Sequence, residues 1–167
     1  MGPTGPQSPT ASAPRDRGMK DRDDALRTCC PSAQPDWAGA VAFGIIGGTA
    51  REPRVGYLEV AQPVSGQLLK LAEPVSPSEV FRFAASCLHG GCVHFQDDAC
   101  TLVRRMVQLL PEVTSELPSC AIRDSCRWWR QEGAAACWRC PQVVTDNYNP
   151  SGAMRAAAHP PELMPAA

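Results

Sequence analysis

Residues 119–141 read SCAIRDSCRWWRQEGAAACWRCP, and this stretch is expected to decide the fold. It holds four of the nine cysteines of the chain, three of its four tryptophans and four arginines, and it ends in a Cys-x-x-Cys-Pro sequence. Four thiolates that converge on one point can hold a tetrahedral zinc ion or a cubane iron–sulfur cluster. We therefore predict that this stretch folds around one metal centre, whose ligands are Cys120, Cys126, Cys137 and Cys140.

A second block of cysteines lies upstream, in the spacing C-x4-C-x7-C, and contains two histidines. Cys87, Cys92 and Cys100 are expected to form or complete a second site together with His94, because three thiolates and an imidazole are a known zinc ligand set. His94 is preferred to His89 because it follows Cys92 by two residues. The two cysteine blocks also resemble each other in the order of cysteines, loops and aromatic pairs, as two copies of one loop–helix unit would.

Two features favour iron–sulfur over zinc. Cys140 is followed by Pro141, which resembles the end of bacterial ferredoxin motifs, although the ferredoxin spacing C-x2-C-x2-C-x3-C is absent. The uneven spacing and the bulky tryptophans suit a cluster that must be shielded from water, whereas zinc ribbons use two Cys-x-x-Cys pairs and this chain has one. We expect a 4Fe–4S cluster, with zinc as the alternative. One cluster that takes ligands from both blocks, and buried cysteines without metal, also stay open.

The arginines and tryptophans of the stretch are expected to surround the metal centre. Arginine N–H groups offset the negative charge of thiolates, and tryptophan rings exclude water. Another role for them is nucleic-acid binding, in which tryptophan stacks on bases and arginine binds phosphate. Acidic residues dilute the positive charge of this segment, so nucleic acid is not favoured. The residues expected to face the cofactor are Trp128, Trp129, Arg127 and Arg130.

The composition and the N-terminal segment indicate in which cellular compartment the protein is expected. The net charge is −1, so electrostatics neither favour nor exclude a polyanionic partner. The N-terminal segment lacks the apolar core of a signal peptide, and the longest apolar run, AVAFGIIGG, is about half of a membrane span. We therefore expect a cytoplasmic protein without membrane contact. Thiols stay reduced there, so clustered cysteines indicate metal or redox chemistry, and nine of them cannot all pair within one chain.

No enzyme motif stands out in the sequence. It lacks GxSxG, HExxH, a dinucleotide fingerprint and a Walker motif, and GIIGGT at 44–49 lacks the lysine of a phosphate loop. We expect an iron–sulfur accessory protein that transfers electrons to, or senses redox state for, another protein. The alternative is a structural-zinc interaction module that contacts nucleic acid through its arginine and tryptophan face. A thiol enzyme has the least support.

The expected fold is a small α+β domain, mostly helical and stapled by metal, with a short β-hairpin. Residues 1–36 are rich in proline and polar residues and are expected to be disordered, and residues 151–167 are expected to form a loose tail. The domain between them is predicted over residues 37–150, with a β element and short helix up to residue 75 and a helical metal-binding part from residue 76. Cys29 and Cys30 fall in the first tail and are not expected to be ligands, because adjacent side chains diverge.

Local patterns predict the individual elements. Two runs of β-branched and aromatic residues around a Gly/Pro connection predict a hairpin over 37–60, and 64–72 predicts a short helix. SPSEVFRFAAS at 76–86 predicts a helix that begins with a capping box from Ser76 and Glu79.

Two further helices are predicted in the cysteine-rich half. Apolar residues at helical spacing predict a helix over 97–111, capped by Asp97 or Asp98. A short helix is predicted over 125–132, capped by Asp124 and ended by Gly133.

Overall fold

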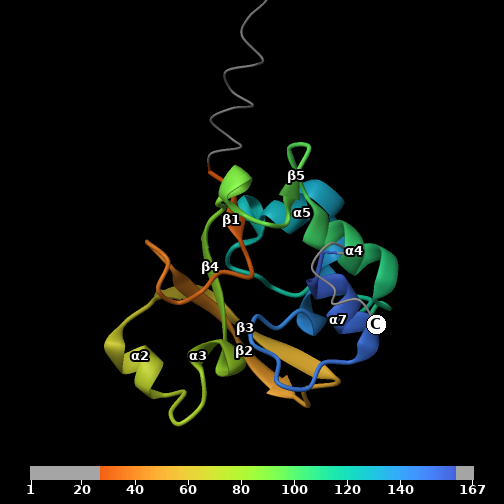
Figure 1. Cartoon of the computed structure of the whole chain (residues 1–167). Helices are drawn as coiled ribbons and strands as arrows, with labels where there is room; N and C mark the ends of the chain where they lie inside the picture. The colour runs from red at the N-terminus through yellow and green to blue at the C-terminus, as the bar shows by residue number, and fades with distance from the viewer. Residues whose placement is uncertain (1–26, 161–167) are drawn as a thin grey trace, which may run out of the picture.

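The computed structural model describes residues 27–160; the part of the expected N-terminal tail at residues 1–26 and the C-terminal residues 161–167 lie outside them. The main sheet is antiparallel, with four strands in the order β1-β4-β2-β3 (Figure 1). Its strands are β1 (Cys29–Cys30), β2 (Val41–Gly48), β3 (Pro53–Pro63) and β4 (Phe81–Ser86). A second, two-stranded sheet pairs β5 (Phe95–Gln96) with β6 (Ala99–Cys100).

The helices fall into two groups in space (Figure 1). Two short ones, α2 (Gly66–Lys70) and α3 (Pro77–Val80), lie at one end of the main sheet. The others come from the C-terminal half and pack together beside β1 and β4. They are α4 (Thr101–Leu109), α5 (Arg127–Glu132), α6 (Ala134–Cys137) and α7 (Gly152–Ala158). The 3-10 turns η2 (Arg123–Ser125) and η3 (Cys140–Gln142) lie between them along the chain, and η1 (His89–Gly91) precedes α4.

The expected hairpin over 37–60 is present as β2 and β3. Thr49 and Glu52 close its turn, since the N–H of each donates to the carbonyl of the other, at 3.2 and 3.1 Å. Gly48 enters this turn with φ +76°, and a Cβ there would lie 2.4 Å from the carbonyl oxygen of Glu52. Only glycine fits this position, and the glycine-rich segment is a strand end and turn, as the sequence predicts.

The predicted helix over 76–86 is wrong beyond its first turn. The capping box of Ser76 and Glu79 is present, but α3 ends at Val80 and the chain continues as strand β4. β4 lies between β1 and β2, and five of its six residues are buried. A central strand is selected by pairing on both sides and by burial, and these outweigh the local helical pattern.

The two faces of β4 bury different partners. Phe81 and Phe83 pack with residues of α2, while Arg82 and Ala84 face the cysteine-rich layer. This alternation follows from the period of two in a β-strand. Phe43 of β2 packs with Ala84 on the second face, so that face forms the floor under the cysteine-rich segment.

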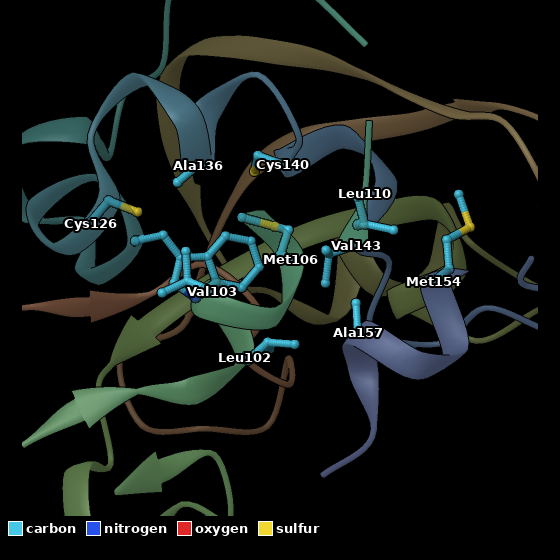
Figure 2. Packing of buried hydrophobic residues seen from close by; sticks show 11 residues of the cluster. Leu102, Val103, Met106, Leu110, Cys126, Ala136, Cys140, Val143, Met154 and Ala157 are labelled. Carbon is cyan, nitrogen blue, oxygen red and sulfur yellow. The ribbon is translucent and has the colours of Figure 1, made fainter. Parts of the chain in front are cut away.

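The helices of the C-terminal half share one apolar core (Figure 2). Leu102, Val103 and Met106 supply one stripe of α4, as the sequence predicts, and Leu110 follows them. Cys126 and Cys140 lie in the same core, on either side of Ala136 (Figure 2). Two of the predicted ligands are therefore built into the packing of this layer.

The predicted helix caps differ from the observed ones. Asp97 and Asp98 do not cap a helix; both have positive φ, 49° and 56°, and form the turn between β5 and β6. Cys100 caps α4 instead, and Cys126 rather than Asp124 caps α5. Gly133 ends α5 with φ 59°, as expected.

Both predicted tails include residues that belong to the folded domain. Residues 27–36 belong to the fold, with Thr28, Pro31 and Ala33 buried and β1 paired to β4. The C-terminal segment forms α7, whose Met154 and Ala157 are buried against α4. These two short segments are ordered because the domain supplies the apolar surface on which they pack.

The expectation of an α+β fold is confirmed, but the fold is not mostly helical: 33% of it is helix and 24% is strand. The strands that the sequence does not predict are β1, β4, β5 and β6. Within residues 27–160, no helix combines the length and the apolar character that crossing a membrane requires.

Candidate metal centre

Four cysteines of residues 119–141 line one pocket. Cys120, Cys126, Cys137 and Cys140 contribute to its wall. The sequence predicts that these four residues converge, and the structure brings them to the same pocket. The rest of the wall is largely apolar and includes Phe43, Tyr57, Ile122, Trp128 and Trp129.

Short helical turns between the four cysteines bring them around the pocket. Cys120 precedes η2, in which the N–H of Arg123 donates to the carbonyl of Cys120 at 3.2 Å. The N–H of Cys126 then donates to the carbonyl of Arg123 at 3.0 Å, and Cys126 begins α5. Cys137 ends α6 and Cys140 begins η3, so the Cys-x-x-Cys pair spans the junction of two turns.

Arg82 lies beside this pocket, and the sequence does not predict its role there. Its side chain is 1% exposed, and one NH2 donates to the sulfur of Cys140 at 3.6 Å. It also donates to the carbonyls of Cys140 and Pro31, both at 2.9 Å. One feature of the sequence does single it out. Arg82 is the one charged residue in the apolar run VFRFAA at 80–85, a run that is typical of a buried strand.

Two aromatic rings enclose the buried guanidinium of Arg82. Its central carbon lies 5.5 Å from the ring centroid of Phe43 and 5.9 Å from that of Trp128. Trp128 is itself only 2% exposed. The guanidinium is thus held beside Cys140 by two aromatic rings, with water largely excluded.

Burial favours the neutral form of the Cys120, Cys126 and Cys137 thiols, because it raises the pKa of each. Burial raises the pKa of Cys126, and the neighbouring Cys140 raises it further. Burial likewise raises the pKa of Cys120 and of Cys137, again with a further contribution from Cys140. These thiols lie close enough for their charges to interact, and a bound metal would displace their protons.

Arg123 is a second cation at this pocket. It hydrogen-bonds to the carbonyl of Pro118 and lies over the ring of Trp129, 5.5 Å from its centroid. Its charge and a hydrogen bond act on Cys137 in the direction opposite to burial, lowering the pKa of that thiol. The sequence predicts this role for Arg127 and Arg130 instead.

The predicted cofactor-facing residues separate into two groups. Trp128 and Trp129 line the pocket, as expected. Arg127 and Arg130 point elsewhere: Arg127 donates to Nδ1 of His89 at 2.9 Å and lies over Phe95, while Arg130 donates to the carbonyl of Asp124 at 2.9 Å. Neither arginine is among the residues that line the pocket of the four cysteines.

The upstream cysteines form a second thiol group. Cys87 follows β4 directly, Cys92 follows η1, and Cys100 lies at the junction of β6 and α4. Burial raises the pKa of Cys100, and Cys92 and Cys87 raise it further. Burial also raises the pKa of Cys30 to about 12, with smaller contributions from the same three cysteines.

The imidazole of His94 contacts Arg105, with its Nδ1 3.0 Å from Nη2 of that arginine. The backbone of His94 contacts its neighbours: its N–H donates to Sγ of Cys92 at 3.4 Å, and its carbonyl accepts from Thr101 Oγ1 at 3.0 Å. Burial lowers the pKa of His94, and the charges of Arg105 and His159 lower it further. The imidazole is therefore neutral, with the lone pair of Nδ1 used by Arg105.

The thiols line the pocket without closing on a point. Within residues 27–160, no group of three or more Cys, His, Asp or Glu side chains has the geometry to hold a metal ion. The free volume of the pocket is about 20 Å³, roughly that of one water molecule. Four thiolates around one zinc ion would place their sulfurs about 3.8 Å from one another, because the Zn–S distance is about 2.3 Å and the geometry is tetrahedral.

Comparisons with known protein families, with curated proteins and with solved structures gave no match for this chain.

Proposed function

We propose that this chain is an iron–sulfur protein in which Cys120, Cys126, Cys137 and Cys140 hold a 4Fe–4S cluster. It serves another protein as an electron-transfer or redox-sensing accessory. The observation that carries this proposal is the pocket that these four cysteines line together, walled by aromatic rings and with a buried arginine at its edge. Four cysteine thiolates are the usual ligands of such a cluster.

The buried charge of Arg82 supports an anionic occupant. A guanidinium is always protonated, and burying it costs several kcal/mol unless a negative charge compensates. Among residues 27–160, the hydrogen-bond acceptors of Arg82 are two carbonyl groups and the sulfur of Cys140, and none of them is a carboxylate. A thiolate-ligated cluster beside Cys140 would supply the missing negative charge.

The exposure of the ligands supports a role in electron exchange. Cys126 and Cys140 are buried, which would shield a cluster from water, while Cys120 and Cys137 are half-buried. When bound, the cluster would take up and release one electron, and hydrogen bonds and solvent exposure would set its potential. The half-buried side of the site is where a partner protein would approach.

The runner-up is a structural-zinc module, which the small pocket favours. Its free volume of about 20 Å³ accepts an ion more readily than a cubane. A nucleic-acid role for such a module has less support, because Trp128 is buried and its ring cannot stack on bases. We place either version in the reducing cytoplasm, where thiols stay available as ligands.

Purification without oxygen, followed by absorption spectroscopy and metal analysis, tests the proposal. The protein is expected to be brown, to absorb near about 400 nm and to contain iron and sulfide in equal amounts. Cys126→Ser should lose this absorption, while Tyr148→Phe, at an exposed ring, should keep it. A colourless protein with stoichiometric zinc would replace this proposal with the zinc module.

A further inference from the structure

We propose that Cys29 and Cys126 are a thiol–disulfide modification site: when no metal centre is bound, a small disulfide such as oxidised glutathione joins them in a reversible bond. Cys126 is one of the four cysteines that line the pocket of the proposed cluster. The chain can therefore hold the cluster or this disulfide, but not both. Formation of the bond does not depend on the proposed function, whereas the competition with the cluster rests on it.

Cys29 and Cys126 face each other across a β-bridge, although they are far apart in the chain. Cys29 of β1 pairs with Ser86 of β4, and it also pairs with Cys126 in an isolated parallel bridge. Backbones paired in this way lie about 4.7–4.9 Å apart. A disulfide requires Cα atoms about 4.4–6.8 Å apart. The fold thus holds the two backbones at a separation that a disulfide bond can span.

The side chains of the two cysteines meet in the same place. Cys126 belongs to the apolar core around Trp128, and Cys29 packs against that core (Figure 2). The hydroxyl of Ser125, the residue before Cys126, donates to Sγ of Cys29 at 3.4 Å. Cysteines whose side chains diverge cannot be joined, and these contacts direct both side chains toward the start of α5.

The bridge singles out this pair among the cysteines of the fold. In the strand pairs and bridges of residues 27–160, no other cysteine faces a cysteine: Cys30 faces Ala85, and Cys100 faces Phe95. Cys-x-x-Cys at 137–140 brings two thiols close along the chain, but it spans the junction of two helical turns rather than a paired backbone.

The exposure of the two thiols sets the order of the reaction. Cys29 is half-buried and Cys126 is buried, so the thiolate of Cys29 attacks the small disulfide first. A mixed disulfide forms on Cys29 and one glutathione thiolate leaves. The thiolate of Cys126 then attacks the sulfur of Cys29, and the second glutathione leaves. Two cysteine thiols have lost two protons and two electrons, and the small disulfide has taken up both to become two thiols.

Ser125 is a positioning residue for the first step. A hydrogen bond to a thiolate favours the charged form, which is the nucleophile. Burial raises the pKa of Cys29, and the hydrogen bond from Ser125 acts against it. The same hydroxyl lies 3.2 Å from the carbonyl of Ile122, so two acceptors share its single hydrogen. Its removal should therefore slow the oxidation without preventing it.

The bond would take one ligand away from the proposed cluster. Cys126 lines the pocket together with Cys120, Cys137 and Cys140, whereas Cys29 is not among the lining residues. A 4Fe–4S cluster is usually held by four thiolates, and the disulfide leaves three in the pocket. Loss of the cluster frees Cys126 to react with Cys29, and a bound cluster prevents this. This exchange gives the redox-sensing form of the proposed function a chemical basis.

Disulfide mapping of the unaltered full chain tests the bond. Metal-free protein is incubated with oxidised glutathione, its free thiols are blocked with iodoacetamide, and it is cleaved with trypsin without reductant. Residues 28–51 and 124–127 are expected in one linked peptide, which dithiothreitol should separate. Glutathione adducts alone, or a link between residues 137 and 140 with none between these two peptides, would overturn the proposal.

Matched variants identify the residues that take part, because Cys29 and Cys30 lie in the same tryptic peptide. Cys30→Ser should still give the linked peptide, and Cys29→Ser should not. The reverse result would assign the bond to Cys30 and overturn the proposal. Ser125→Ala should form the bond about threefold more slowly, the effect expected of one shared hydrogen bond. An equal rate would remove Ser125 from the reaction.

The same oxidation of loaded protein separates this site from the proposed function. The chain is loaded without oxygen from ferrous iron, sulfide and dithiothreitol, and small molecules are removed before glutathione is added. Linked peptide should form at least about tenfold more slowly than in metal-free protein, because the cluster occupies Cys126. Equal rates with the iron retained would overturn the competition. A chain that takes up no iron, yet gives the linked peptide, would overturn the proposed function and leave the disulfide standing.

Discussion

The guanidinium of Arg82 lies 3.6 Å from the sulfur of Cys140, and both side chains are buried. A central strand thus places a permanent positive charge beside Cys140, at the edge of the cysteine pocket. Two carbonyl groups and two aromatic rings fix its position. Any centre held by Cys140 would be formed within reach of this charge.

Replacing Arg82 is expected to lower the reduction potential of a cluster at this pocket. The reduced cluster carries one more negative charge than the oxidised one, so a nearby cation stabilises the reduced form. Arg82→Gln removes that cation while keeping hydrogen-bond donors. A spectroscopic redox titration of loaded protein measures the shift, and Arg51→Gln in the exposed β2–β3 turn is the matched control. An unchanged potential in Arg82→Gln would place the cluster away from Cys140.

Trp128→Ala is expected to destabilise the metal-free protein by about 3–5 kcal/mol, the usual cost of removing a large buried aromatic ring. Trp128 is almost fully buried and packs in the core shared by α4, α5 and α7. Urea unfolding monitored by circular dichroism gives the free energy of unfolding. Tyr148→Ala is the control, because the tyrosine is 81% exposed, and it should change the stability by less than about 0.5 kcal/mol. Similar losses in the two variants would contradict the described core.

Gly48→Ala is expected to destabilise the hairpin by more than about 1 kcal/mol, because a side chain is incompatible with its positive φ and with the nearby carbonyl of Glu52. Gly47→Ala provides a close comparison. Gly47 has no atom within 4 Å of an added Cβ and no positive φ, so this change should be neutral or slightly stabilising. Thermal unfolding of the two variants separates these cases, and equal melting temperatures would argue against the observed turn.

Ala157→Asp tests whether the C-terminal segment is docked. Ala157 is buried between α7 and α4, so an aspartate there would bury an unpaired charge and cost about 3 kcal/mol or more. Ala153→Asp, in the exposed first turn of the same helix, places its charge where the helix dipole favours it. Urea unfolding should therefore distinguish the two variants strongly. Equal stability would mean that α7 does not pack as described.

Elements with a clear local pattern could be predicted from the sequence. The hairpin follows from two β-rich runs around a glycine turn, and α4 follows from its apolar stripe. The pocket of Cys120, Cys126, Cys137 and Cys140 could be predicted because their spacing is short enough for local turns to gather them.

Features that depend on distant partners could not be predicted. Residues 81–86 begin after a valid capping box, yet they pair with β1 and β2 and so form a strand. The position of Arg82 beside Cys140 follows only once this pairing is known. No local rule connects residues so far apart in the chain.

The position of β1 sets a limit on how this protein can be shortened. A version that begins at Trp37 would lack the edge strand, the buried methyl group of Ala33 and the carbonyl of Pro31 that anchors Arg82. Its sheet would expose the backbone groups of β4 along a new edge, which invites pairing with other chains. Fragments prepared for crystallography or spectroscopy should therefore start ahead of Thr28.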